Sequence, residues 1–205
     1  MASTKISPAL LFALLFKPTA VFNELSTTRP LAYAVFFRVA LWLGLIPPVF
    51  AYIGGSLFGW RLGAVEPIYF SSGVLLTISI AYFLTLLFGF VSSALVSQWM
   101  ASTYGARHSL GIHLALITVV GAPLAVGSVI HLYPHVFINI LVLVPTLIWS
   151  MYLLYRGLPI VLRISPERGM LMASSLVGYL LVAAVSLLGI TVVLWGQGIG
   201  PRVGI

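Results

Sequence analysis

Long stretches without a charged side chain dominate this sequence, and short segments that carry the charges separate them. Lys, Arg, Asp and Glu are absent from residues 39–60, 67–106, 109–155 and 169–201. An α-helix rises about 1.5 Å per residue and needs about 20 residues to cross the hydrocarbon core of a bilayer. Each stretch can therefore hold at least one membrane-spanning helix.

The third stretch is long enough for two helices, and its sequence contains a break. The segment "HLYPH" at 131–135 includes Pro134, which would remove a hydrogen bond from a helix interior. The pattern predicts an all-α fold, a polytopic membrane protein built as a bundle of five transmembrane helices. The expected spans are about 32–54, 69–97, 110–130, 136–155 and 171–195, within a transmembrane domain (31–196) that lies between an N-terminal segment (1–30) and a tail (197–205).

The N-terminal segment has an apolar pattern of its own. Residues 8–16, "PALLFALLF", are too short to span a bilayer. No small-x-small cleavage site follows them, so we expect the segment to be retained rather than removed as a signal peptide. Apolar residues recur at helical spacing from Leu10 to Leu25, with a kink or restart at Pro18. We predict an amphipathic helix lying in the membrane interface, and a cap packed on the bundle fits the pattern equally well.

Composition excludes several classes of protein. Hydrophobic residues make up 61% of the 205 residues and charged residues only 6%, whereas soluble domains carry about 25% charged residues. Cysteine is absent, which excludes disulfides and cysteine-bound metals. The net charge of +7 does not indicate nucleic-acid binding, because the basic residues are scattered singly and form no patch.

The basic residues instead predict the orientation of the spans. In the five-span arrangement, eight of the ten lie on the N-terminal side and two on the other. An excess of Lys and Arg faces the cytoplasm, so we expect a plasma (inner) membrane protein with a cytoplasmic N-terminus and an extracytoplasmic C-terminus. Without the first span the distribution would be six against four, a weaker bias. The eight residues are Lys5, Lys17, Arg29, Arg38, Arg107, Arg156, Arg163 and Arg168, and the two are Arg61 and Arg202.

Three arginines gather between the fourth and fifth spans. Arg156-Gly157 is typical of a helix end, and Ser165-Pro166-Glu167 is typical of a helix start, with serine as the N-cap. This predicts a short link over 157–164. Arg156, Arg163, Arg168 and Lys17 are the candidate contacts for anionic lipid headgroups or for a partner protein. The alternative is that they only mark the cytoplasmic side.

Prolines and small residues inside the spans have two interpretations each. Pro47, Pro48 and Pro123 indicate either structural kinks, which we favour, or broken helices that line a substrate path. Small residues four apart let helices approach closely, within the bundle or at the seam of a homo-oligomer. These small residues are Gly89, Ser93 and Ser97 in the second span, Gly121 and Ala125 in the third, and Ser174 and Gly178 in the fifth.

Catalytic and metal chemistry have little support in the sequence. His131 and His135 are four residues apart, but Pro134 disfavours a helix there, so they are weak metal candidates even with Glu66 as a third ligand. The chain has three acidic residues, and no zinc-protease, nucleophile-elbow or phosphate-loop motif is present. We therefore predict that the protein is not an enzyme and uses no metal or cofactor.

Three segments resemble the Yip-domain (Ypt/Rab-interacting-protein) family of integral membrane proteins, in particular its bacterial inner-membrane branch. They are "FKPTAVFNEL" (16–25), "GAPLAVGSVIHLYP" (121–134) and "WSMYLLYRGLPIVLRISPERG" (149–169). The resemblance implies five transmembrane helices, a cytoplasmic N-terminus and no known enzymatic activity. Eukaryotic relatives act in membrane traffic and organelle shaping. This chain lacks their aspartate-leucine-tyrosine-glycine-proline motif, so GTPase binding is not implied.

Two functions remain as hypotheses from the sequence. The first is a non-enzymatic membrane protein that binds lipid, another membrane protein or a second copy of itself. The second is a small transporter or channel subunit, with a water-accessible path beside the three prolines.

Overall fold

The computed structural model describes residues 13–61, 63, 66–106 and 108–197 of the chain, and these residues are almost entirely helical. Five helical segments are long and apolar enough to cross a membrane: Ala32–Phe58, Ser72–Thr103, Leu110–Leu132, Val136–Leu162 and Pro166–Gly196. The β-structure of the described residues is limited to two isolated bridges. The prediction of an all-α, five-span membrane protein is confirmed.

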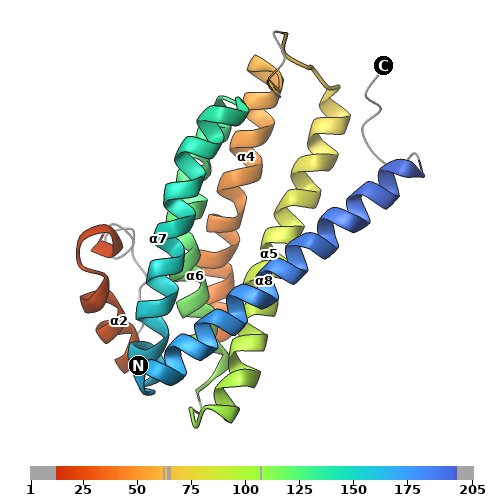
Figure 1. Ribbon diagram of the computed structural model, residues 1–205. Coiled ribbons are helices and arrows are strands. Elements are labelled where there is room, and N and C mark those ends of the chain that lie inside the picture. Colours follow the sequence, from red (N-terminus) through yellow and green to blue (C-terminus); the bar gives the residue numbers. More distant parts are fainter. Residues whose placement is uncertain (1–12, 62, 64–65, 107, 198–205) are drawn as a thin grey trace.

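The helices follow one another along the chain as an up-and-down bundle (Figure 1). The first span combines α3 (Ala32–Val35), a π-helical turn η1 (Phe36–Ala40) and α4 (Leu41–Phe58). The second is α5 (Ser72–Thr103). The third combines α6 (Leu110–Gly127) and a 3₁₀ turn η2 (Ser128–Leu132), and the last two are α7 (Val136–Leu162) and α8 (Pro166–Gly196). A shorter helix, α2 (Pro18–Thr27), precedes them.

The helix α6 occupies the centre of the bundle. Eleven of its residues are buried, compared with four in α8, and α6 packs against α3, α4, α5 and α7. In Figure 1, α8 crosses the bundle at an angle, and its second half runs away from α4 and α7. No residue from 177 to 197 is buried, and beyond Val177, which packs against the main hydrophobic cluster, this half of α8 adds no residue to the core of the described chain.

The link between the last two spans is shorter than predicted. α7 does not end at Arg156-Gly157 but continues through Pro159 to Leu162. Gly157 serves close packing rather than a helix cap, because a Cβ there would lie 2.7 Å from the Phe22 ring. The left-handed cap falls on Arg163 instead (φ 53°), and the Pro159 carbonyl accepts the amide hydrogen of Ile164 (3.2 Å). The predicted start of α8 is confirmed, since Ser165 accepts the amide hydrogen of Arg168 and Pro166 is the first helical residue.

The prolines inside the spans do not interrupt the helices. α4 runs through Pro47 and Pro48, and α6 runs through Pro123. Two carbonyls one turn before the proline pair, on Leu43 and Gly44, lose their helical donors. Both residues are buried, so the surrounding protein holds the helical path there. The broken helix considered for these positions is not observed.

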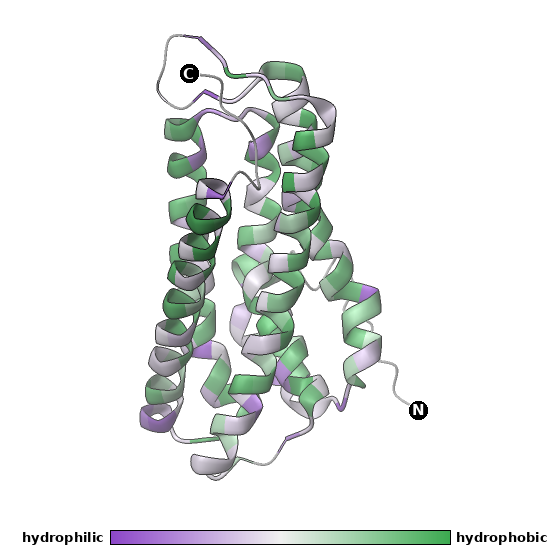
Figure 2. Ribbon diagram, turned by 90° about the vertical axis from the view of Figure 1, so that its right-hand side faces the viewer, coloured by the Kyte–Doolittle hydropathy of each residue, from purple (hydrophilic) through white to green (hydrophobic). Residues whose placement is uncertain are grey.

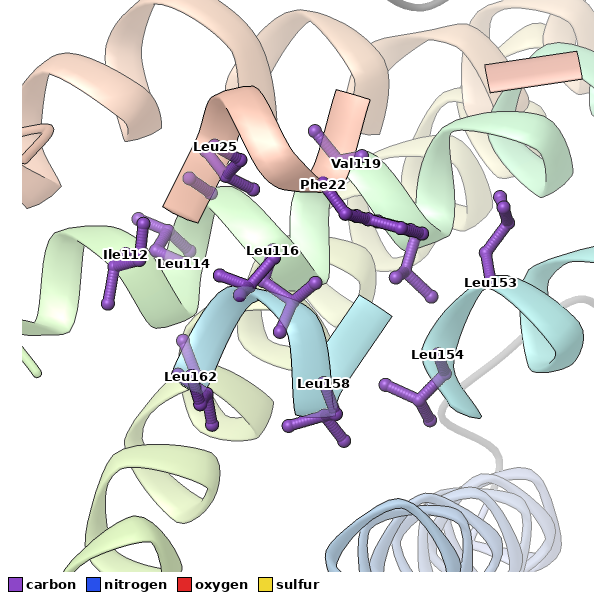
Figure 3. Packing of buried hydrophobic residues seen from close by; sticks show 14 of the residues in the cluster. Phe22, Leu25, Ile112, Leu114, Leu116, Val119, Leu153, Leu154, Leu158 and Leu162 are labelled. Atoms are coloured by element: carbon purple, nitrogen blue, oxygen red, sulfur yellow. The ribbon is translucent and has the colours of Figure 1, made fainter. Parts of the chain in front are cut away.

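The N-terminal helix packs as a cap on the bundle rather than with its apolar face in lipid. Val21, Phe22 and Leu25 of α2 are buried in the main hydrophobic cluster. Figure 3 shows Phe22 and Leu25 among leucines of α6 and α7. Phe22 is completely covered. Of the two predicted arrangements, these contacts support the cap packed on the bundle, because the buried face of α2 is paired with protein.

The small residues behave differently in different spans. Ser93, Ser97 and Ala125 are buried between helices, and a Cβ on Gly121 would lie 2.8 Å from the ring of Phe90. Gly89 and Gly178 would have nothing within 4 Å of such a Cβ. The packing interpretation holds for α6 and for Ser93 and Ser97 of α5, whereas Gly89 and Gly178 face no described residue within 4 Å.

Candidate functional site

The described basic residues gather at one end of the bundle. Lys17, Arg29 and Arg38 precede or begin the first span, and Arg156, Arg163 and Arg168 lie where α7 gives way to α8. The opposite end holds Arg61 and Glu66. Figure 2 shows hydrophobic residues along the length of the helices and hydrophilic residues mainly toward their ends. Three further basic residues used in the orientation argument lie outside the described residues: Lys5, Arg107 and Arg202.

Two of the three clustered arginines connect helices. The Arg163 side chain donates from Nη2 to the carbonyl of Ser26 (3.2 Å), in the last turn of α2. Arg168 donates from Nη1 to the carbonyl of Tyr104 (3.3 Å), the C-cap residue of α5. The C-terminal end of a helix carries partial negative charge and unpaired carbonyls, so a guanidinium is favourable at both positions. Arg163 and Arg168 therefore have structural contacts that the sequence did not reveal.

Arg156 differs from both. Its side chain is exposed and has no hydrogen-bond or ion-pair partner among the described residues. It lines a groove of about 440 Å³ between the end of α7 and the start of α8. The other lining residues are mostly apolar or aromatic: Tyr152, Tyr155, Pro159, Ile160, Ile164, Pro166 and Met170.

The groove is held open at a fixed crossing of two helices. A Cβ on Gly169 of α8 would lie 2.7 Å from the Pro159 ring of α7, so the helices touch at that point. Above it, the Tyr155 hydroxyl and the Ser174 hydroxyl lie 2.9 Å apart and form a hydrogen bond between the two helices. These two contacts connect α7 and α8 on the groove that Arg156 lines.

Arg156 lies about one bilayer thickness along α7 from the start of that helix. Twenty residues separate it from Val136 at the start of α7, which is roughly 30 Å at about 1.5 Å per residue and equals the thickness of the hydrocarbon core. Trp149 and Tyr152 pack together just before it, with ring centroids 5.0 Å apart. Aromatic residues of this kind are enriched at the level of the headgroups.

Lys17 stands apart from this groove. It is exposed at the start of α2, and the described side chains provide no contact between it and Arg156. The structure therefore separates the four predicted lipid-contacting residues into two helix connectors, one isolated lysine and one groove residue.

The two candidate metal ligands belong to a different network at the opposite end. His131 Nδ1 lies 2.5 Å from Asn139 Oδ1, and the His135 ring stacks on Tyr133 with centroids 6.1 Å apart. Among the described residues no group of three or more His, Cys, Asp or Glu side chains could hold a metal. Asn139 was missed from the sequence, although an asparagine inside a strongly apolar span is a signal that could have identified it.

A second buried polar pair was not predicted from the sequence. His113 of α6 and Ser97 of α5 are both fully buried, and Ser97 Oγ lies 2.8 Å from His113 Nδ1. The spacing of Ser97 indicated packing only, and nothing in the sequence paired it with a histidine 16 residues away. The prediction that the protein is not an enzyme stays a prediction.

Comparison with known proteins agrees with this architecture. The model of the Yip1 domain family matches residues 12–187, which is most of the chain. The chain belongs to the Yip1 domain family. This Yip1-domain protein is 32% identical, over 158 residues, to the Inner membrane protein YohC of Escherichia coli strain K12 and to its counterpart in E. coli O6:H1, covering 77% of this chain and 81% of each relative. No solved structure matches the chain.

The family assignment confirms the resemblance predicted from the three segments of sequence. Together with five apolar helices it supports a multi-pass inner membrane protein.

Proposed function

We propose that this Yip1-domain protein is a non-enzymatic membrane protein that binds an anionic phospholipid in the groove between α7 and α8. The observation that carries the proposal is Arg156, an exposed guanidinium without a partner in the described chain, at the edge of an apolar groove. The phosphate of the lipid would face Arg156, and an acyl chain would lie against the apolar wall.

The chemistry of the groove favours this ligand over others. A guanidinium presents a planar fork of donors that matches a phosphate, and hydrogen bonds of this charged kind contribute about 1.5 to 3 kcal/mol. The groove residues include no acidic side chain that could neutralise Arg156. Ile160, Ile164 and Met170 offer an apolar surface that opens toward the lipid, so one molecule with both an anionic and an apolar part satisfies the whole groove.

The proposal includes an orientation. The arginine-rich end faces the cytoplasm, with the N-terminus inside and the C-terminus outside, because an excess of Lys and Arg remains on the cytoplasmic side and anionic lipids attract it. Reporter fusions at the two ends test this, and two ends in the same compartment would contradict it. Binding of another membrane protein or of a second copy remains a prediction from the sequence.

The groove is tested by measuring retained lipid. The protein and its variants are purified in mild detergent, incubated with phosphatidylglycerol or phosphatidylcholine, and analysed by native mass spectrometry. We expect Arg156→Gln to lower phosphatidylglycerol binding roughly tenfold, the equivalent of about 1.4 kcal/mol, with little change for phosphatidylcholine.

Arg163→Gln is the matched control, since it removes an equal charge from the same end without touching the groove. It should leave phosphatidylglycerol binding close to that of the unmodified protein. Equal losses in both variants would show a general electrostatic attraction and would contradict a specific site. Unchanged binding in Arg156→Gln would also reject the groove.

A further inference from the structure

A second cavity lies at the end of the bundle opposite the arginines and is independent of the lipid groove. It measures about 290 Å³, and its walls come from α4, α5, η2, the segment after α4 and the start of α7. Most of its surface is apolar, from Ala51, Leu75, Ile78, Pro134 and Val136. Its size is close to the lower end of the roughly 300 to 1,000 Å³ typical of small-molecule sites.

The polar edge of the cavity is a fixed hydrogen-bond network. Asn139 donates through Nδ2 to the carbonyls of Tyr133 (3.0 Å) and His135 (2.9 Å). Both amide hydrogens are thereby used, and Oδ1 must face His131 Nδ1 as the acceptor. The proton of the neutral His131 ring therefore lies on Nδ1, and Nε2 is left as an acceptor at the cavity.

His131 Nε2 takes part in only one hydrogen bond among the described residues, and that bond is weak. The Tyr82 hydroxyl is its described partner, at the long distance of 3.4 Å. An acceptor that is available in an apolar cavity favours a ligand that brings an O–H or N–H donor. Tyr82 and His131 both line the cavity, so such a ligand would lie against the wall that these two side chains form.

An unused donor lies at the same cavity. The indole nitrogen of Trp60 is buried and has no hydrogen-bond partner among the described residues. A Cβ on Gly55 would lie 2.6 Å from this nitrogen and also close to the Leu75 side chain. Gly55 is one helical turn beyond Ala51, and both Ala51 and Leu75 line the cavity. This N–H is covered by protein on the side of Gly55, so it is a polar atom within the cavity wall and not a group that the cavity exposes.

These features together define a ligand. A hydroxyl brings the O–H donor that His131 Nε2 can accept, and its oxygen can itself accept a hydrogen bond. Three aromatic rings in the lining, those of Trp60, Tyr82 and His131, favour an aromatic ring over an aliphatic chain. No charged side chain lines the cavity, so the ligand is uncharged. We propose that this cavity binds a small uncharged aromatic ring bearing a hydroxyl group, a phenol or a quinol.

The site is tested with a photoreactive probe. A phenol that carries a diazirine, and a matched probe without the hydroxyl, are irradiated with the purified protein, and labelled residues are mapped by mass spectrometry. We expect the phenol probe to label residues within 51–60, 75–82 and 131–139, and the probe without the hydroxyl to label them several times less.

Three variants distinguish binding from a general loss of folding. Ala51→Leu fills the cavity without removing a polar group, and should abolish labelling while the melting temperature does not fall. His131→Leu should lower labelling roughly five- to tenfold, as expected for loss of one buried hydrogen bond. His135→Phe, which keeps a ring against Tyr133 and lies outside the cavity lining, should leave labelling unchanged.

Two competitors identify the source of the ring. Competition by p-cresol and by a quinol with an isoprenoid tail at similar concentrations would indicate a free small molecule, and much stronger competition by the tailed quinol would indicate the head of a membrane lipid. No competition by either, labelling that does not need the hydroxyl, or labelling that survives Ala51→Leu would overturn the proposal. Arg156→Gln should not affect labelling, so failure here is distinct from failure at the lipid groove.

Discussion

At the arginine-rich end of the bundle, side chains of α2, α6 and α7 form one buried apolar cluster, with the Ser97–His113 pair buried beside it and the arginines outside it. At the opposite end, Trp60, Tyr82 and His131 line a half-open cavity between helices, and hydrogen bonds lie along its polar edge. The two ends therefore differ in what fills the space between their helices. Apolar side chains fill it at the first end, whereas part of it stays unfilled at the second end. The groove at the first end lies outside the packed core, whereas the cavity at the second end lies between helices and is also open to the surroundings.

Backbone contacts also hold the end with the cavity together. The second end is joined by short bridges that pair Trp60 with Ile68 and Arg61 with His135. Arg61 also places its guanidinium over the Tyr133 ring, 5.7 Å from the centroid. Backbone and ring contacts of this kind hold loops in place without filling the volume between them, which explains how a cavity persists beside an ordered network.

The largest test of the comparison is the removal of the Phe22 side chain. Phe22→Ala deletes a completely buried ring between α2 and α7 and should cost about 3 to 5 kcal/mol. Thermal unfolding in mild detergent measures the loss, with Phe37→Ala, whose side chain is 61% exposed, as the control. Equal stability of the two variants would show that α2 is not part of the core.

A smaller loss is expected at the opposite end from Gly54→Ala. A Cβ there would meet the backbone carbonyls of His131 and Leu132, so α4 and η2 must separate. Overpacking of this kind costs about 1 to 3 kcal/mol, and the separation should also weaken phenol labelling of the cavity. Gly178→Ala, with nothing within 4 Å, is the control. Unaltered labelling in Gly54→Ala would mean that η2 can move without disturbing the cavity.

The buried pair between α5 and α6 should respond more weakly still. Ser97→Ala removes the described partner of His113 Nδ1 while His113 Nε2 already lacks one. The loss of one such hydrogen bond should cost about 1 kcal/mol or slightly more. Ser92→Ala is the comparison, since that hydroxyl bonds only to the carbonyl of Gly89 in its own helix. If Ser97→Ala and Ser92→Ala have the same melting temperature, the Ser97–His113 pair does not stabilise the protein.

The smallest change is expected for Arg163→Gln. The side chain is exposed, and its contact with Ser26 fastens only the end of α2. We expect almost the same melting temperature as for the unmodified protein. A protease added to the detergent solution should cleave the chain faster within residues 17–28. The Arg168 side chain contacts α5 instead, so Arg168→Gln should not speed that cleavage. Equal acceleration in both variants would show that the contact of Arg163 with α2 has no separate effect.

Several local features were predictable because neighbouring residues produce them. Ser165, Pro166 and Glu167 specify the start of α8 within three positions, and the structure has the helix start there. The end of α7 was not predictable in the same way. Gly157 looks like a cap in sequence, and only the Phe22 ring, 135 residues earlier in the chain, shows that it is a packing position.

The candidate sites were predictable only in part. The sequence identified Arg156, Arg163 and Arg168 as a group, but their separate roles depend on carbonyls of α2 and α5 that lie 137 and 64 residues away. The cavity could not be predicted at all. Tyr82 and His131, which are 49 residues apart, meet only when α5 and η2 pack on α4.

The sequence by itself determined the number of spans, because a bilayer accepts only long uncharged helices, and composition alone reveals these. Tertiary structure decided which faces of those helices meet protein. Lipid tails are as apolar as leucine, so hydrophobicity does not distinguish a face in the core from a face in the bilayer. The central α6 and the peripheral α8 are both apolar enough to span, and only the fit of their side chains against neighbouring helices separates them.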